Sequence, residues 1–204
     1  MSSHHFVKEQ QEPAVFLLDL ENIHLDLISG LLEWVPTILV CESIVDQVIS
    51  WGIKIDVILA SEEFQKANSH LLEEQYPLKF LQVRNGNFLD EGLHYLKASK
   101  HEAVHLVGIS HEKAFELAPK LNEMNITLID GNWKYYPVKS GEFKKWFLEG
   151  DIHIHGKEGM PLEIKNSEGE MLLPINYATM IEVPEGITSI KAPGIFWIGE
   201  KIGS

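Results

Sequence analysis

Residues 37–59 read TILVCESIVDQVISWGIKIDVIL, and the order of residue types along them indicates a strand, a helix and a second strand. The runs TILVC and IKIDVIL are mostly β-branched or apolar, as is usual in buried strands. Between them, Ser43 is suited to cap a helix that continues through Trp51, and Gly52 is suited to end it. The stretch therefore predicts a βαβ unit, in which a helix connects two parallel strands.

The same alternation extends outward from this stretch, from residue 14 to about residue 130. Further strands are expected at 14–20, 78–83, 103–107 and 126–129, and further helices at 25–33, 61–75, 88–98 and 111–124, the last interrupted by Pro119. Successive βαβ units predict an α/β fold with a mostly parallel sheet flanked by helices. Ligands of such sheets bind beyond the carboxyl ends of the strands, so a site is expected in the loops after residues 20, 41, 59, 83 and 107.

The pattern changes after Val138. Short alternating runs separated by Gly, Pro and Asn follow, at 151–155, 162–165, 171–174, 179–183, 187–191 and 195–198. Short strands with frequent turns predict a small all-β, sandwich-like domain. The expected organisation is therefore an α/β domain over residues 1–138 and a β domain over residues 139–204.

The composition excludes several classes of protein. Among 204 residues, 45% are hydrophobic and 23% are charged, which is ordinary for a globular chain. The formal charge of −13 disfavours nucleic acid and anionic membrane surfaces as partners, because both are negatively charged. No apolar run approaches the ~20 residues of a membrane span, and residues 1–13 lack the apolar core of a signal peptide. A cytoplasmic protein that binds neither nucleic acid nor membrane is expected.

Few residues point to chemistry on their own, since the chain lacks a Walker A loop, GxGxxG, HExxH and GxSxG. Cys41, the single cysteine, ends an apolar strand and is interpreted as a buried, unreactive thiol rather than a nucleophile. His153 and His155 share one strand face, a spacing compatible with a metal, but without a third ligand a solvated face is the preferred interpretation. The pair Glu62-Glu63 fits either a helix start or a site at the ligand edge.

Residues 41–59 resemble the thiamine pyrophosphokinase family, in which C-D-G-A-A opens a helix and G-I-x-P-D-x-I-I-G-D-x-D-S follows it. Here GIKIDVIL at 52–59 is in register with the second motif. Further along, EGLHYL at 91–96 resembles the family's K-A-L-x-Y-L, and Gly108 falls where the family has I-x-G-x-x-G-x-R-x-D-H. The resemblance covers roughly residues 14–137, and it implies a β-sandwich after them and a homodimer.

The family transfers a pyrophosphoryl group from ATP to the hydroxyl of thiamine, giving thiamine diphosphate and AMP. Such chemistry depends on positioning and on neutralising phosphate charge with Mg²⁺, which prefers carboxylate ligands. The resemblance thus implies thiamine or a nucleotide as the small-molecule ligand. It implies Mg²⁺ and ATP as cofactors if the protein is active, and none otherwise.

The family motifs, carried over residue by residue, give candidate cofactor-binding residues in three places. Glu21 stands where the family has the Glu of N-G-E, and Glu42-Ser43 stand where it has the Asp and Gly of C-D-G. Ser110, His111 and Lys113 fall in the region of R-x-D-H.

Two residues are candidate metal ligands, Glu63 at the second Asp of G-D-x-D-S and Asp90 close to the Q-D-x-x-D region. Most other Asp and Arg positions of the family are occupied by different residue types, among them Ser61, Asn85 and Phe88. Of the 30 acidic residues 23 are Glu, and Arg84 is the only arginine, so the acids and bases that phosphate transfer uses are scarce.

Four hypotheses follow. The first is a thiamine pyrophosphokinase-like protein that is weakly active or inactive and binds a small ligand or a partner. The second is an active enzyme with relocated ligands, drawn from Glu21, Glu42, Glu63, Asp90 and Glu112. The third is a related nucleotide-dependent pyrophosphotransferase, for example one that acts on a pterin. The fourth is a helix–sheet domain that only resembles the family.

Overall fold

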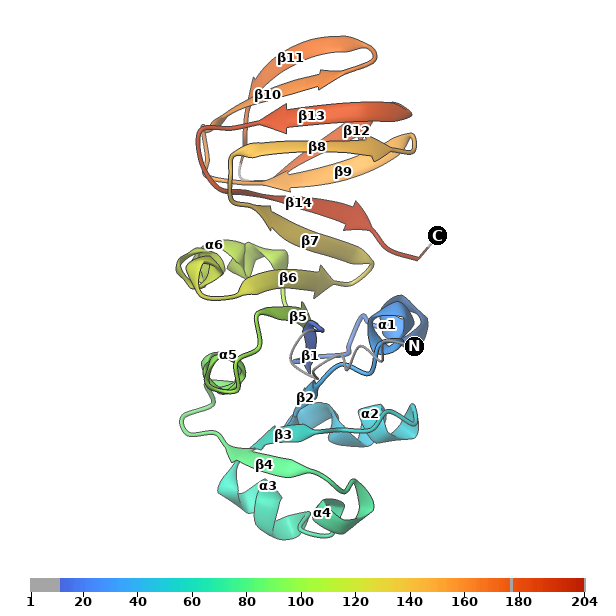
Figure 1. Ribbon diagram of the computed structural model, residues 1–204, viewed down its shortest axis with the longest axis vertical. Coiled ribbons are helices and arrows are strands. Elements are labelled where there is room, and N and C mark those ends of the chain that lie inside the picture. The colour runs from blue at the N-terminus through green and yellow to red at the C-terminus, as the bar shows by residue number, and fades with distance from the viewer. Residues whose placement is uncertain (1–11, 177, 204) are drawn as a thin grey trace, which may run out of the picture. The chain divides into compact units, whose positions relative to one another are not determined.

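The computed structural model describes residues 12–176 and 178–203 (Figure 1). These residues form two compact units. The first unit extends to Ile109 and also includes Lys120–Ile126, whereas the second comprises Ser110–Pro119 and the chain from Thr127 onward. No helix of the described residues is long and apolar enough to cross a membrane.

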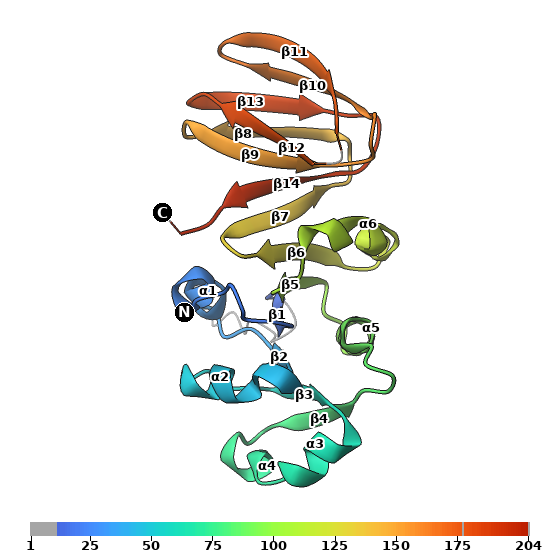
Figure 2. The ribbon, with the colours of Figure 1, turned by 180° about the vertical axis from the view of Figure 1, so that it is seen from behind.

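The first unit is built on a parallel sheet, as the sequence predicts. Its spatial order is β5-β1-β2-β3-β4 (Figure 2), and its bounds are β1 Ala14–Leu17, β2 Ile38–Cys41, β3 Val57–Ala60, β4 Lys79–Gln82 and β5 Ala103–Val107. Each neighbouring pair in this order is parallel. All residues of β1, β2 and β3 are buried, as expected for central strands of a parallel sheet that is covered on both faces.

Helices connect these strands: α1 Leu25–Leu32, η1 Glu42–Ile44, α2 Val45–Ser50, α3 Glu62–Ala67, α4 Leu71–Glu74 and α5 Phe88–Ala98. The prediction of a helix over residues 88–98 is confirmed by α5. This helix packs closely on β1, because a Cβ atom added at Gly92 would lie 2.2 Å from the Phe16 ring. A side chain at position 92 would therefore force α5 away from the sheet.

The prediction of a single helix over residues 61–75 is wrong, since the segment forms α3 and α4 with a break between them. Asn68 stands at the break with φ of −117°, outside the helical range. Its Nδ2 donates a hydrogen bond to the carbonyl oxygen of Phe64 at 3.0 Å. A side-chain amide that binds a nearby backbone carbonyl offers the chain an alternative to continuing the helix.

The expected interruption of the 111–124 helix near Pro119 is confirmed, although the segment is more divided than expected. The structure contains three short pieces there, η2 His111–Lys113, α6 Ala114–Leu117 and η3 Ala118–Asn122. Pro119 lacks the N–H that an α-helix needs at that position, which accounts for the change to 3₁₀ geometry.

The second unit contains two antiparallel sheets, in the orders β6-β7-β14-β9-β12 and β11-β10-β13-β8. The bounds are β6 Asn125–Asp130, β7 Trp133–Val138, β8 Glu142–Phe147, β9 Gly150–His155, β10 Pro161–Asn166, β11 Gly169–Pro174, β12 Ala178–Val183, β13 Gly186–Lys191 and β14 Phe196–Lys201. One buried cluster includes Ile154 and Phe196 from the first of these sheets and Ile164 and Ile190 from the second. The two sheets therefore share a core, and the predicted sandwich-like β region is confirmed.

One strand of this unit differs from the sequence expectations. β8 was not expected as a strand, because the adjacent Lys144 and Lys145 interrupt the alternation of apolar and polar residues. β7 pairs with β14 along its whole length, from Phe196 opposite Val138 to Lys201 opposite Trp133. β7 therefore belongs with the antiparallel strands of the second unit, which in this part of the chain begins at Thr127.

Candidate functional site

The loops at the carboxyl edge of the parallel sheet are acidic. Asp19 and Glu21 follow β1, and both side chains are exposed. The Oδ1 atom of Asp19 accepts a hydrogen bond from the backbone N–H of Glu21 at 2.8 Å, an Asx-type turn that fixes this loop. Gly108, directly after β5, has a φ of +76°, and a Cβ atom there would lie 1.8 Å from the Asp19 carbonyl oxygen. The loops after β1 and β5 are thus in direct contact.

Glu42, directly after β2, is bound to the residue that follows β3. Its Oε2 atom accepts hydrogen bonds from the backbone N–H of Ser61 at 2.7 Å and from the Ser61 hydroxyl at 2.8 Å. The Ser61 hydroxyl oxygen in turn accepts from the backbone N–H of Phe64 at 3.2 Å, so Ser61 caps α3. Two loops at the carboxyl edge are therefore held together by one carboxylate oxygen.

The charges of two of these acids act on Cys41, the last residue of β2. The thiol is 5% exposed, and burial raises its pKa to about 12, with further contributions from the charges of Glu42 and Asp19. The predicted burial of Cys41 is confirmed, and its raised pKa disfavours the thiolate, which is the reactive form. The same interaction places the negative charges after β1 and β2 within electrostatic range of one sulfur atom.

The other candidate residues of the first unit lie at this edge or near it. Ser43 is exposed in η1, beside Glu42. Glu63 is exposed in the first turn of α3, and its neighbour Glu62 pairs with Lys66 Nζ at 2.5 Å. The structure thus brings Glu42 and Ser43 next to the start of the helix that carries Glu63.

Asp90, the second candidate metal ligand, is already engaged. Its Oδ1 atom lies 2.6 Å from Lys120 Nζ, and its Oδ2 atom accepts from Asn87 Nδ2 at 2.8 Å. The hydrogen bond from Lys120 lowers the pKa of Asp90, followed by that from Asn87. A metal ion at Asp90 would have to displace these partners.

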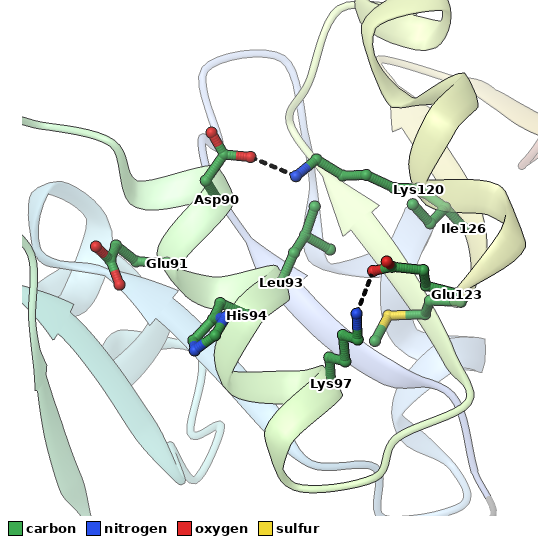
Figure 3. A pocket seen from close by; sticks show the side chains of 9 residues that line it. Asp90, Glu91, Leu93, His94, Lys97, Lys120, Glu123 and Ile126 are labelled. Atoms are coloured by element: carbon green, nitrogen blue, oxygen red, sulfur yellow. Dashed lines mark ion pairs between the residues drawn. The ribbon is translucent and has the colours of Figure 1, made fainter.

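Asp90 lines a cavity of about 500 Å³ beside α5, with two ion pairs across it (Figure 3). One is Asp90 with Lys120, and the other is Lys97 with Glu123 at 2.7 Å. Leu93 lies between the two pairs in Figure 3. Because the charges across the cavity neutralise each other, neither of its described lysines is free to bind a phosphate group.

The remaining candidates, Ser110, His111 and Lys113, lie together in the second unit. The Ser110 hydroxyl oxygen accepts from the backbone N–H of Glu112 at 3.3 Å and caps η2. Lys113 Nζ lies 3.8 Å from Glu116 Oε2. His111 is bound twice by Asp130, whose Oδ2 accepts from the backbone N–H at 2.9 Å and lies 2.7 Å from Nδ1.

Aromatic side chains surround His111, a feature that the sequence motifs do not predict. Its ring stacks on Tyr135 with centroids 4.9 Å apart and planes 10° apart. The Tyr135 hydroxyl lies 2.9 Å from His153 Nδ1, and His153 stacks on Trp133 with centroids 3.9 Å apart. The signal was present in the alternation of Trp133 and Tyr135, which places both on one strand face.

The expectation of a solvated strand face at His153 and His155 is wrong. His155 is fully buried, with the Phe115 ring 4.5 Å from its own, and His153 is covered by Trp133. The aromatic residues of β7 and α6 pack over this face of β9, which the strand sequence alone does not reveal. Within the described residues, no group of three or more His, Cys, Asp or Glu side chains is arranged to hold a metal ion.

A parallel α/β unit with an acidic carboxyl edge, joined to a unit of two antiparallel sheets, defines the class of this protein. The chain has the thiamin pyrophosphokinase fold. It is similar over 94% of its length to thiamin pyrophosphokinase from Geobacillus thermodenitrificans (9% identity, 98% of that chain, TM-score 0.70) and to thiamine pyrophosphokinase from Bacillus subtilis (13% identity, 100% of that chain, TM-score 0.69). Yeast thiamin pyrophosphokinase is similar as well (8% identity, 94% of this chain and 87% of that one, TM-score 0.63). The sequence matches no protein-family model and none of the curated proteins.

Proposed function

We propose that this protein binds a thiamine-like cation at the carboxyl edge of its parallel sheet and transfers pyrophosphate weakly or not at all. The observation that carries the proposal is the engagement of Glu42 and Asp90 with the protein's own groups. Glu42 is held in place by Ser61, which preorganises a carboxylate for a bound cation. Asp90 is neutralised by Lys120, which opposes its use as a ligand of Mg²⁺.

The charge at this edge favours an organic cation over a free nucleotide. Acidic side chains follow β1, β2 and β3, whereas Arg84 is the only arginine of the chain and follows β4. The thiazolium ring of thiamine carries a permanent positive charge that such an edge attracts. A triphosphate would be repelled unless its charge were neutralised first.

Mg²⁺ and ATP belong to this proposal only as far as some activity remains. Bound Mg²⁺ would neutralise the charge of the triphosphate. Glu63 and Asp90 are the residues proposed to hold it, together with oxygens of the phosphates, since Mg²⁺ commonly binds through one or two carboxylates. Asp90 fits that role only after it releases Lys120.

The test combines an assay with a binding measurement. Purified protein with thiamine, ATP and Mg²⁺ is expected to release little or no AMP, while calorimetry detects binding of thiamine. Glu42→Gln should weaken that binding, and Glu73→Gln, an exposed substitution in α4, should leave it unchanged. Sustained turnover that Glu63→Ala abolishes would contradict the proposal and support an active enzyme with relocated ligands, and absence of heat with thiamine would remove the binding role.

The proposal also includes a homodimer. Trp146 and Ile187 are neighbours on paired strands, and both side chains are more than half exposed, at 51% and 55%. Adjacent large apolar side chains on one sheet surface are a feature of interfaces between subunits. Light scattering coupled to size-exclusion chromatography is expected to give twice the chain mass of 23.2 kDa, and a monomer mass at micromolar protein would contradict the homodimer.

A further inference from the structure

A second cavity opens at the edge of the parallel sheet opposite to the candidate site. It has a volume of about 680 Å³, and residues that precede β2, β3, β4 and β5 line it, together with the end of α5. This volume lies within the range of pockets that hold small molecules, roughly 300–1,000 Å³. Because it lies before the strands and not after them, the cavity is independent of the function proposed above.

The charge of this cavity is unlike that of the rest of the chain. Lys54 and Lys79 line it, and neither forms an ion pair with any residue that the structure describes. The acidic residue of the lining, Asp56, is partly buried, and its Oδ2 accepts the backbone N–H of Ile38 at 2.8 Å. Two unpaired cations in a chain with a net charge of −13 mark a place where an anion would be attracted.

The polar base of the cavity is fixed by a buried histidine. His101 is 7% exposed, its Nε2 lies 3.0 Å from Thr37 Oγ1, and its Nδ1 lies 3.2 Å from Ser99 Oγ. Burial lowers the pKa of His101, which keeps the ring neutral at physiological pH. The base therefore supplies oriented polar groups without an added charge, and the charge of the cavity comes from its lysines and Asp56.

The apolar part of the lining is formed by Leu32, Val35, Pro36, Ile53 and Val57. Val35 has a φ of +51°, a left-handed conformation that is strained for a β-branched residue. Its side chain is 84% exposed, and the adjacent Trp34 is 72% exposed. Strained backbone and exposed large apolar side chains at the same rim are typical of binding sites.

We propose that this cavity, defined by Lys54, Lys79 and the apolar residues around Val35, binds a small molecule that has an apolar body and carries one anionic group. The apolar body contacts the apolar lining, and the carboxylate, sulfonate or phosphate group binds to the two lysines. The combination of a mostly apolar cavity and a few convergent polar groups is the general form of a small-molecule site.

The test uses 8-anilinonaphthalene-1-sulfonate as the probe and the full-length chain as the protein. Saturable binding with one site is expected from the increase in fluorescence. Lys54→Ala/Lys79→Ala should weaken binding about tenfold, because it removes both cations. The matched control is Lys144→Ala/Lys157→Ala, which changes the net charge equally through two exposed lysines of the second unit.

Two further measurements test whether the anionic group of the probe is recognised and where on the protein the probe binds. The neutral probe N-phenyl-1-naphthylamine, which lacks the sulfonate, should bind equally to the wild type and the double variant. Amide chemical shifts of Lys54, Tyr95 and Ser99 should move with the sulfonate probe. Unsaturable binding, equal weakening by both double variants, or shifts confined to other residues would each overturn the proposal.

Discussion

One carboxylate oxygen of Glu42 accepts both the backbone N–H and the hydroxyl of Ser61, at 2.7 and 2.8 Å. The two residues are 19 positions apart, and each directly follows a strand of the parallel sheet. The bond therefore connects neighbouring loops at the edge where ligands of α/β sheets bind. It also orients the hydroxyl that caps α3, so a change at Glu42 acts on a loop and a helix together.

Glu42→Ala is expected to lower the free energy of unfolding by about 1–3 kcal/mol, because it leaves the partly buried N–H of Ser61 without its acceptor. Glu42→Gln should lower the free energy of unfolding less, since the amide oxygen of glutamine can still accept one hydrogen bond from Ser61. Urea unfolding measures both changes. Glu21→Ala is the control in the adjacent exposed loop and should cost less than about 0.5 kcal/mol. Equal losses in Glu42→Ala and Glu21→Ala would show that the bond to Ser61 does not stabilise the fold.

Asp90→Asn tests the ion pair with Lys120 through its dependence on pH. The hydrogen bonds from Lys120 and Asn87 lower the pKa of Asp90 in the folded protein. An acid with a lowered pKa stabilises the fold above its unfolded pKa of about 4, and this contribution is lost as the pH falls through the folded value. At pH 7 the free energy of unfolding of the wild type should exceed that of Asp90→Asn by about 0.2–1 kcal/mol. The difference is small because the side chains of Asp90 and Lys120 are both partly exposed. Thermal unfolding between pH 3 and 7 should show the difference decreasing toward the acid end. A difference as large at pH 3 as at pH 7 would mean that packing, and not charge, accounts for it.

The sequence predicts the order of strands and helices in the parallel unit well, because its buried strands are short apolar runs between clear helix starts. The helix expected at 88–98, which the structure contains as α5, is an example of such a local signal. Predictions failed where a side chain competes with the backbone, as Asn68 does at the end of α3. They also failed at β8, where two adjacent lysines hide the period of two.

The candidate site is only partly accessible to sequence reasoning. Motif positions identify Glu42 and Asp90, but the partners that engage them come from distant segments, Ser61 and Lys120. The anchoring of His111 by Asp130 depends in the same way on a contact across 19 residues of chain. Such pairs follow from the packing of elements, which a single sequence does not encode locally.

Cys41 should not react in the native protein. Burial, with the charges of Glu42 and Asp19, raises its pKa to about 12, so the thiol stays protonated at pH 8. Ellman's reagent at pH 8 is expected to modify the native protein far more slowly than the urea-unfolded protein, which should react with one equivalent. Equal rates in the two states would contradict the burial of this thiol.

His153 should make stability depend on pH near neutrality. Burial, followed by the charge of His111, lowers the pKa of His153 in the folded protein. A histidine with a lowered pKa leaves stability intact above its unfolded pKa of about 6.5, and stability is lost as the pH falls from there toward the folded value. Urea unfolding should therefore show that the free energy of unfolding decreases less from pH 7.5 to pH 5.5 in His153→Gln than in the wild type. The exposed His70→Gln is the control, and a loss in His153→Gln equal to that of the wild type would assign the effect to other groups.

Gly108→Ala should be among the most damaging single substitutions at the carboxyl edge. A Cβ atom at position 108 would lie 1.8 Å from the carbonyl oxygen of Asp19, and the φ of +76° is unfavourable for alanine as well. Gly86→Ala is the matched control, because it has a φ of +68° but nothing within 4 Å of the added atom. The control is expected to lower the free energy of unfolding by about 1 kcal/mol through backbone strain alone. Gly108→Ala should lower it by more than about 3 kcal/mol, since the loop of Asp19 must move.

Because that movement also displaces the carboxylate of Asp19, calorimetry on any folded fraction of Gly108→Ala should show weaker binding of thiamine. Equal stability of the two variants would show that the contact between the loops after β1 and β5 relaxes without cost.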